Sequence, residues 1–298
     1  MIYSSQDNNQ ITILHLSDFH FNEESREEIT TVLDALFVDL HELRDEYGVS
    51  PNLVVISGDI ANAGDQADYN FALDWLYNLL EKLKISPDNV FIVPGNHDID
   101  RNKLTEFSKL KFDDEDSVTK FLNKGGDERT ATFKKLDNFY EFIKNFYGDK
   151  NPYRENYYLA TTMQVGESRI GIVGLNTTWF SGERRFENGS VIVDDKALIV
   201  GESQVRKAYE FLGDVDLCFT VMHHPFSYLA DFDEGIIKRV VMKNSNIIFH
   251  GHIHSSSTTE TIEPDSRCIT LSAGASYIKN RIKRYTVCKI NLEDFSYD

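Results

Sequence analysis

The stretch ITILHLSDFH, residues 11–20, joins an apolar run to a polar sequence that begins at Asp18. The run from Ile11 to Leu16 has the length and composition of a buried strand. Asp18 and His20 follow it at once, so both side chains are expected at the end of this strand. Because strands bring distant parts of a chain side by side, groups at several strand ends can converge on one point.

Two further apolar runs end in the same way. LVVIS at 53–57 precedes Gly58-Asp59, and VFIVP at 90–94 precedes Gly95-Asn96-His97-Asp98. This order predicts a βαβαβ unit, in which parallel strands are joined by crossover helices. Apolar residues at helical spacing place these helices near 24–47 and 67–84.

The rest of the chain changes character twice. Residues 100–150 are charged and helical, and they predict two or three inserted helices, the last near 130–147. This insertion forms either a cap over the site or a surface helical hairpin. From Tyr157 short alternating strands follow, with a hairpin at Gly166-Glu167-Ser168 and a helix near 202–213, which predicts a mixed or antiparallel sheet. We expect one domain, residues 1–298, that contains the insertion.

Composition excludes several classes of protein. The 298 residues carry a net charge of −17, which weighs against non-specific binding along a nucleic acid. No run reaches the ~18 apolar residues of a membrane span, so we expect no association with a membrane. The polar N-terminus lacks the features of a signal peptide, so we expect a cytoplasmic protein. The acidic run Asp113–Asp116 is typical of a solvated loop. The chain stops just after a strand at Asp298, which leaves open further domains or a protein partner.

The cysteine pattern predicts free thiols rather than disulfides or a metal site. Cys218, Cys268 and Cys288 are odd in number and widely spaced, and each lies in a strand-like segment. This pattern argues against a disulfide framework and against a Cys-x-x-Cys metal site. It predicts three buried free thiols.

Five segments, each after an apolar run, supply metal-binding side chains. Besides the three above, they are His223-His224-Pro225, after LCFTVM, and Gly251-His252-Ile253-His254, after NIIF. Their carboxylates, amide and imidazoles suit a pair of borderline transition metals rather than a structural zinc or a calcium site. Glycines precede three of the segments, and we expect them to let the backbone turn sharply at the strand end. The candidate ligands are Asp18, His20, Asp59, Asn96, His223, His252 and His254, and the glycines are Gly58, Gly95 and Gly251.

These motifs, in this order, resemble the signature of the calcineurin-like metallophosphoesterases. The resemblance spans residues 18–254 and implies a four-layer α/β/β/α sandwich of two mixed sheets flanked by helices, with a helical insertion. It further implies two divalent metal ions at the strand ends, with Mn²⁺ as the first choice and Fe or Zn as alternatives. By the same resemblance, Asp18, His20 and His254 hold the first ion, Asn96, His223 and His252 hold the second, and Asp59 bridges both.

The resemblance also implies a chemistry. A water shared by two cations loses a proton near neutral pH, and the resulting hydroxide attacks phosphorus in line. His97 faces the substrate and assists the leaving group, and Asp98 either orients the His97 ring or caps the following turn. Arg101, Asn176 and His224 are candidate substrate-binding residues near the expected site.

The motif sequences favour a diester substrate. Protein phosphatases of the family carry Asp-Arg-Gly after the bridging Asp, whereas residues 58–64 read GDIANAG, which looks more like the bacterial cyclic-nucleotide phosphodiesterase branch or nucleases near it. The insertion departs from the compact form of that branch. The expected function is therefore a two-metal-dependent phosphodiesterase. Its natural substrate stays open, and a nucleotide or a nucleic acid is among the candidates. The alternatives are a nuclease effector domain of a larger protein, a phosphomonoesterase, or a catalytically silent protein-binding scaffold. A nuclease path has two basic candidates, Arg184-Arg185-Phe186 and residues 279–284.

Overall fold

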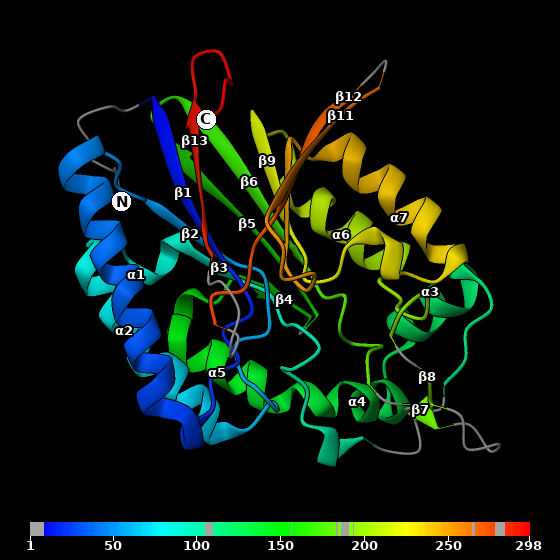
Figure 1. Ribbon diagram of the computed structural model, residues 1–298. Helices are drawn as coiled ribbons and strands as arrows, with labels where there is room; N and C mark the ends of the chain where they lie inside the picture. The colour runs from blue at the N-terminus through cyan, green and yellow to red at the C-terminus, as the bar shows by residue number, and fades with distance from the viewer. Residues whose placement is uncertain are drawn as a thin grey trace.

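The computed structural model describes residues 9–104, 110–155, 157–182, 184–185, 191–192, 194–263, 266–277 and 284–298. Two β-sheets lie face to face, and helices cover the outer face of each sheet (Figure 1). Both sheets contain parallel and antiparallel pairs. The predicted four-layer sandwich of two mixed sheets is therefore confirmed.

The first sheet has four strands in the order β13-β1-β2-β3. β1 pairs parallel with β2, and β2 pairs parallel with β3, which confirms the predicted βαβαβ unit. The closing strand of the chain, β13, returns to pair antiparallel with β1. The strands and their crossover helices are β1 (Gln10–Leu16), α1 (Arg26–Tyr47), β2 (Leu53–Ile56), α2 (Gln66–Leu83), β3 (Val90–Ile92) and β13 (Thr286–Asn291).

The second sheet has seven strands in the order β11-β12-β10-β9-β6-β5-β4. The predicted hairpin joins β5 to β6, and the predicted helix near 202–213 is α6. The sequence reading missed a second helix on this face, α7. The elements are β4 (Tyr153–Arg154), β5 (Tyr158–Val165), β6 (Ser168–Leu175), α6 (Glu202–Leu212), β9 (Leu217–Val221), α7 (Asp231–Asn244), β10 (Ile247–His250), β11 (Ser257–Glu263) and β12 (Ser266–Ser272).

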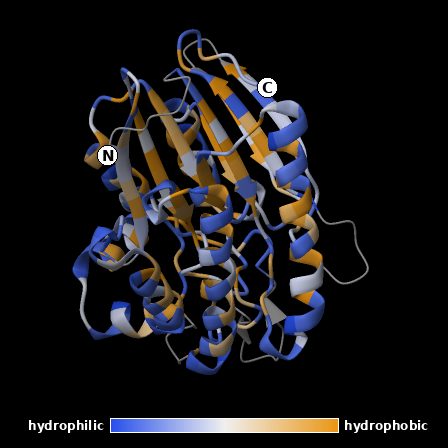
Figure 2. Cartoon of the chain, turned by 90° about the vertical axis from the view of Figure 1, so that its left-hand side faces the viewer, coloured by the Kyte–Doolittle hydropathy of each residue, from blue (hydrophilic) through white to orange (hydrophobic). Residues whose placement is uncertain are grey.

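Alternation along the strands builds three apolar layers. In β1, Ile11 and Ile13 face the other sheet, while Leu14 and Leu16 face α1 and α2. In β9, Leu217, Phe219 and Val221 face the first sheet, and the residues between them face the α6–α7 side. Apolar colour accordingly runs along the strands in Figure 2, and the outward helix faces are hydrophilic. Both faces of each sheet are thereby buried, so the polar strand ends are left as the place for chemistry.

The insertion contains three helices, α3 (Glu115–Lys124), α4 (Asp127–Phe133) and α5 (Asp137–Tyr147). The helix expected near 130–147 is divided by a 3₁₀ turn at Lys134–Leu136. α5 packs on α2, where the rings of Phe142 and Tyr69 stack with centroids 5.0 Å apart. Figure 1 shows α4 and α5 at the end of the molecule where β1, β2 and β3 end. The insertion thus contributes side chains to the core beside that end.

The structure also places the predicted thiols and part of the two basic segments proposed for a nuclease path. Cys218, Cys268 and Cys288 are free and buried, as predicted. No helix in the described parts of the chain combines the length and the apolarity that a membrane span requires. Arg184–Arg185 forms β7, which pairs with β8 (Val191–Ile192). The other residues of the two basic candidates, apart from Arg284, lie outside the described residues.

Candidate metal centre

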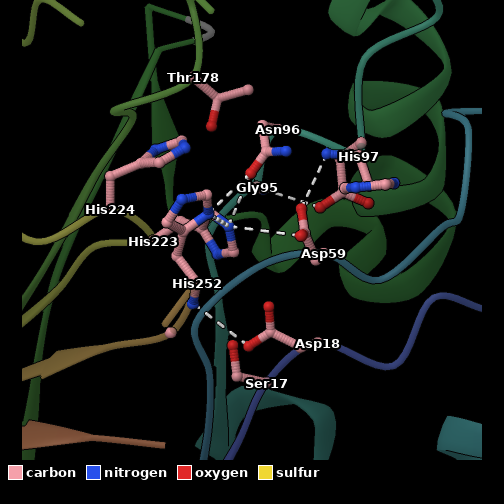
Figure 3. Close-up of polar contacts among 12 residues, drawn as sticks. Ser17, Asp18, Asp59, Gly95, Asn96, His97, Thr178, His223, His224 and His252 are labelled. Atoms are coloured by element: carbon pink, nitrogen blue, oxygen red, sulfur yellow. Dashed lines mark hydrogen bonds and ion pairs between the residues drawn. The ribbon is translucent and has the colours of Figure 1, made fainter. Parts of the chain in front are cut away.

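The carboxyl ends of five strands bring the predicted ligands together. Asp18 follows β1, Asp59 follows β2, and Asn96 follows β3 in the first sheet. His223 follows β9, and His252 follows β10, in the second sheet. Figure 3 shows these five side chains pointing toward one another across the gap between the two sheets. The site therefore lies where the ends of both sheets face each other.

Unusual backbone conformations accompany this convergence. Asp18, His20, Asp59, His252 and His254 all have positive φ angles, between 49° and 70°. Non-glycine residues rarely adopt this left-handed region, because the Cβ atom crowds the neighbouring carbonyl. Such strain persists where surrounding contacts over-determine the conformation, and it clusters at functional sites. Five of the seven predicted ligands have this conformation, so their strand ends are candidates for a functional site.

The first group of candidate ligands comprises Asp18, His20 and His254. His254 Nε2 lies 3.1 Å from Asp18 Oδ1. Asp18 is fully buried, and among the described residues its Oδ1 atom faces no hydrogen-bond donor other than this imidazole. A buried carboxylate oxygen that faces imidazole nitrogens without a hydrogen bond has the environment of a metal ligand.

The second group comprises Asn96, His223 and His252. Asn96 Oδ1 lies 3.1 Å from His223 Nε2 and 3.0 Å from His252 Nδ1, and the two nitrogens are 3.3 Å apart. Bonds of about 2.1 Å to one transition-metal ion separate adjacent ligand atoms by about 3.0 to 3.4 Å. The three atoms therefore fit the ligand face of a single ion.

One oxygen of Asp59 belongs to both groups. Asp59 Oδ2 lies 3.4 Å from His223 Nε2 and 3.9 Å from His20 Nε2. The other oxygen, Oδ1, accepts a hydrogen bond from the backbone N–H of His97 at 2.8 Å. This bond fixes the rotation of the carboxylate, so Oδ2 is the atom directed between the two groups.

A backbone carbonyl determines which nitrogen of His223 is available. His223 Nδ1 lies 2.7 Å from the carbonyl oxygen of Ser57, which can only accept a hydrogen bond. When this ring is neutral, its proton is therefore on Nδ1, and Nε2 then offers its lone pair toward the second group. The sequence reading missed this contact, since a carbonyl carries no residue-type signal.

The charges in the site compensate one another. Burial opposes ionisation of Asp59, but the neighbouring His223 holds the pKa of this carboxyl well below its usual value. Burial lowers the pKa of His223, and Asp59 outweighs it, so that the pKa rises to about 9. Burial and then His223 lower the pKa of His252 to about 4, so this ring is neutral at pH 7. The cluster thus holds ionised carboxylates that favour positive charge between them.

His97 and Asp98 lie beside the ligands and have different surroundings. The His97 ring is 4.5 Å from the His20 ring, and His97 Nδ1 lies 2.8 Å from the carbonyl oxygen of Asn62. Among the described residues, no hydrogen bond joins the Asp98 carboxylate to this ring. The carboxylate accepts hydrogen bonds from the N–H groups of Ile60, Ala61 and Gly95 and from the hydroxyl of Tyr69. Asp98 therefore connects the loop after β2 to the loop after β3, and the carbonyl of Asn62 orients the His97 ring.

The three candidate substrate-binding residues are placed differently. Asn176 is buried, and its Oδ1 accepts hydrogen bonds from the N–H groups of Thr178 and Trp179. Arg101 is exposed at the start of a 3₁₀ turn. His224 lies in the cluster, with ring centroids 4.5 Å from His252, and its Nδ1 bonds to Thr177 Oγ1 at 2.8 Å. His224 is thus the one of the three in ring contact with a predicted ligand.

Comparison with known proteins agrees with this geometry. A sequence model of the calcineurin-like phosphoesterase family matches residues 11–256. Over 258 residues the chain is 24% identical to the uncharacterized metallophosphoesterase-like protein YydB of Bacillus subtilis (strain 168), a match that covers 83% of this chain and 50% of the relative. The chain therefore spans about half the length of that curated relative.

Comparison with solved structures gives two neighbours of low sequence identity. Sulfate thiohydrolase SoxB of Thermus thermophilus superposes with a TM-score of 0.50 at 12% identity, covering 97% of this chain and 55% of that one. Purple acid phosphatase PPD1 from yellow lupin (Lupinus luteus) gives a TM-score of 0.47 at 11% identity, covering 98% and 53%. The family match spans most of the chain and includes every predicted ligand. The chain belongs to the calcineurin-like phosphoesterase family, whose members are metal-dependent hydrolases.

Proposed function

We propose that the chain is a two-metal phosphoesterase that prefers phosphodiesters. The observation that carries this proposal is the position of Asp59 Oδ2 between His20 of the first group and His223 of the second. A shared carboxylate oxygen holds two cations close together in spite of their mutual repulsion. In this assignment Asp18, His20 and His254 hold one ion, Asn96, His223 and His252 hold the other, and Asp59 bridges them.

The residues of the chain prepare this site for an anionic substrate. Two bound divalent ions would supply an acidified water and would neutralise charge on the phosphoryl oxygens. Asn96 ligates through a neutral amide, so it adds no negative charge that would repel a phosphate. The backbone N–H of His97 and the carbonyl of Ser57 hold Asp59 and His223 in their ligating orientations.

His97 is proposed as the acid that protonates the leaving oxygen. Because Nδ1 lies against the carbonyl of Asn62, Nδ1 carries a proton in every ring state, and Nε2 is the nitrogen that gains and loses one. The ring is half-buried beside His20, so it borders the site and is also reached by solvent. A proton held on Nε2 can pass to the departing alkoxide, and water can then restore it.

Neutral surroundings support the preference for a diester. The ring of Tyr228 lies edge-on to His252 with centroids 4.5 Å apart. Ile253, between His252 and His254, is 39% exposed. A diester carries one negative charge and a second organic group, so it suits an apolar rim better than a doubly charged monoester does. A nucleotide or nucleic-acid diester has both properties.

An assay with two chromogenic substrates tests the proposal. We expect faster release of p-nitrophenol from bis-p-nitrophenyl phosphate than from p-nitrophenyl phosphate, with Mn²⁺ giving more activity than Fe²⁺ or Zn²⁺. Protein treated with a chelator is the control, and activity should return when the metal is restored. Faster cleavage of the monoester would replace the diesterase assignment with a monoesterase, and metal-independent turnover would contradict the site itself.

The role of His97 predicts a dependence on the leaving group. His97→Gln should lower kcat by about 10² to 10⁴ because it removes general acid catalysis. The loss should be larger for a phenyl diester than for a p-nitrophenyl diester, since the phenolate of the former needs a proton more. His41→Gln, at an exposed position of α1, is the matched control. Metal content should stay at the wild-type value, and equal losses with both substrates would assign His97 a structural role.

A further inference from the structure

Three elements meet where α6 begins. Helix α3 of the insertion packs directly on the backbone there, because a Cβ atom added to Gly201 would lie 2.8 Å from Leu122 and 2.9 Å from Val118. Helix α7 approaches from the other side and contributes Asp233, which is fully buried. The junction therefore joins the insertion to the second-sheet side of the sandwich.

Two carboxyl groups bind the unpaired N–H groups at this helix end. Asp233 accepts from Val200 N at 2.7 Å and from Gly201 N at 3.2 Å. Glu115, the first residue of α3, accepts from Glu202 N at 2.5 Å through Oε1. Glu115 thus caps a helix that begins 87 residues later in the chain. The acidic run that reads as a solvated loop places this one member at a buried contact.

The two carboxyl groups share one environment without a balancing cation. Among the described residues, neither group forms an ion pair with Lys, Arg or His. Asp233 is buried and Glu115 is half-buried, and two ionised carboxylates at one helix end repel each other, so one proton between them removes the repulsion. We propose that Glu115 and Asp233 form a proton-dependent latch, which holds α3 of the insertion on α6 and weakens as the shared proton is lost.

The neighbouring charges identify the proton carrier. Burial, followed by Glu115, raises the pKa of Asp233 to about 8. Burial also raises the pKa of Glu115, while the hydrogen bonds from Glu202 N and from the Thr119 hydroxyl oppose this rise. Glu115 Oε2 is buried and has no hydrogen-bond donor among the described residues, so a proton on Asp233 would supply one. The remaining acids of this end of α7, Asp231 and Glu234, face Lys196 at 3.7 and 2.5 Å instead.

Docking of α3 on α6 is expected to weaken as the pH rises. The docked state keeps the proton of Asp233 up to about pH 8. Separation of α3 removes Glu115, while the N–H groups of Val200 and Gly201 still favour the ionised carboxylate, so Asp233 then releases its proton over a lower pH interval. Because the docked state binds more protons from that interval up to about pH 8, docking weakens continuously as the pH rises through this range. Above about pH 8 both states are ionised, and no further weakening is expected from this pair.

A chain of contacts leads from the latch to the candidate metal centre. The Gln204 side chain of α6 accepts from Asn176 N at 2.7 Å, at the end of β6. Thr177 holds the His224 ring, and Thr178 Oγ1 donates to the carbonyl of Pro94 at 3.1 Å, just before Gly95-Asn96. Hydrogen bonds thus connect the start of α6, through residues 176–178, to His224 and to the backbone just before Asn96.

Trp179 offers a local probe of docking. Its ring stacks between Phe121 of α3 and Phe133 of α4, with centroids 5.9 and 5.7 Å away. The chain has two tryptophans, so Trp75→Phe leaves Trp179 as the only tryptophan emitter. Urea unfolding followed by Trp179 emission from pH 5 to 9.5 then reports the stability of the packed insertion, without any metal or substrate.

Glu115→Gln is the informative variant, and Glu128→Gln, exposed on α4, is its matched control. The amide of the introduced glutamine still accepts from Glu202 N, and it donates to an ionised Asp233, so docking needs no proton. We expect the urea midpoint of Glu115→Gln to rise above that of Glu128→Gln as the pH increases, and the difference to level off above about pH 8. A difference that does not change with pH would overturn the latch.

Hydrogen exchange provides a second measurement that needs no tryptophan replacement. At pH 9, peptides from α3 should exchange faster in the wild-type protein than in Glu115→Gln, with the two converging at pH 6. Equal exchange of α3 at both pH values would also overturn the proposal. Neither measurement depends on catalysis, so the latch and the phosphodiesterase assignment can fail separately.

Discussion

Replacing Asp59 with Asn is expected to abolish turnover, by at least about 10³-fold, and to remove bound metal. The structure gives a specific reason. The Oδ1 atom accepts from His97 N, so the amide oxygen of the introduced asparagine would take that position. The NH₂ group would then stand in the place of Oδ2, where it faces His20 Nε2 and His223 Nε2. A hydrogen-bond donor would thus replace the one atom that both ligand groups share.

Metal analysis separates this effect from misfolding. We expect two equivalents of Mn²⁺ per chain in the wild-type protein after equilibrium dialysis and at most one, weakly held, in Asp59→Asn. Asp34→Asn, at an exposed position of α1, makes the same chemical change without touching the site and should bind as the wild type does. Two tightly bound ions in Asp59→Asn would contradict the bridging assignment, even if turnover were lost.

The convergence of the predicted ligands follows from sequence pattern for a physical reason. Asp18, Asp59 and Asn96 each come directly after a short apolar run, and parallel pairing of those runs leaves little freedom in where the side chains end up. The same argument applies to His223 and His252, which follow neighbouring strands of the second sheet. Local patterns therefore predicted the edge at which these side chains meet, whereas the four-layer arrangement was predicted from the family resemblance.

Other features depend on contacts that no local pattern encodes. The carbonyls of Ser57 and Asn62 select the free nitrogens of His223 and His97, and every residue type has a carbonyl. The pairing of β13 with β1 joins segments from opposite ends of the chain, so only the folded chain reveals it. The break between α4 and α5 falls within one continuous helical pattern, because tertiary packing outweighs propensity there.

The three motif glycines are required for two different physical reasons. We expected all three to turn the backbone sharply, and Gly58 does have a φ of 99°. At Gly95 and Gly251 the reason is close approach instead. A Cβ atom on Gly251 would lie 2.0 Å from Ser17 Oγ, and one on Gly95 would lie 2.2 Å from Asp59 Oδ1. Both distances are far shorter than any non-bonded contact, so side chains cannot be accommodated without displacement.

Gly95→Ala should therefore damage the site and the fold together. The added methyl group would also meet Asp59 N at 2.4 Å, so the loop carrying Asp59 has to move as a unit. This movement breaks the bond from His97 N to Asp59, and it strains the bond from Gly95 N to Asp98 at 2.8 Å. Overpacking of this kind costs about 1 to 3 kcal/mol, which is a large part of the stability of a domain.

The matched control is Gly235→Ala in α7, where an added Cβ meets no atom within 4 Å. Alanine in a helix interior stabilises by about 0.5 to 1 kcal/mol relative to glycine, so this variant should melt at or above the wild-type temperature. Gly95→Ala should melt several degrees lower in the presence of chelator and should bind neither ion when Mn²⁺ is added. Asp59→Asn removes the bridging atom but does not displace the loop. This variant should therefore lose metal without the same fall in melting temperature. If Gly95→Ala melts like the wild type and binds two ions, close approach does not explain why glycine precedes the Asn-His-Asp motif.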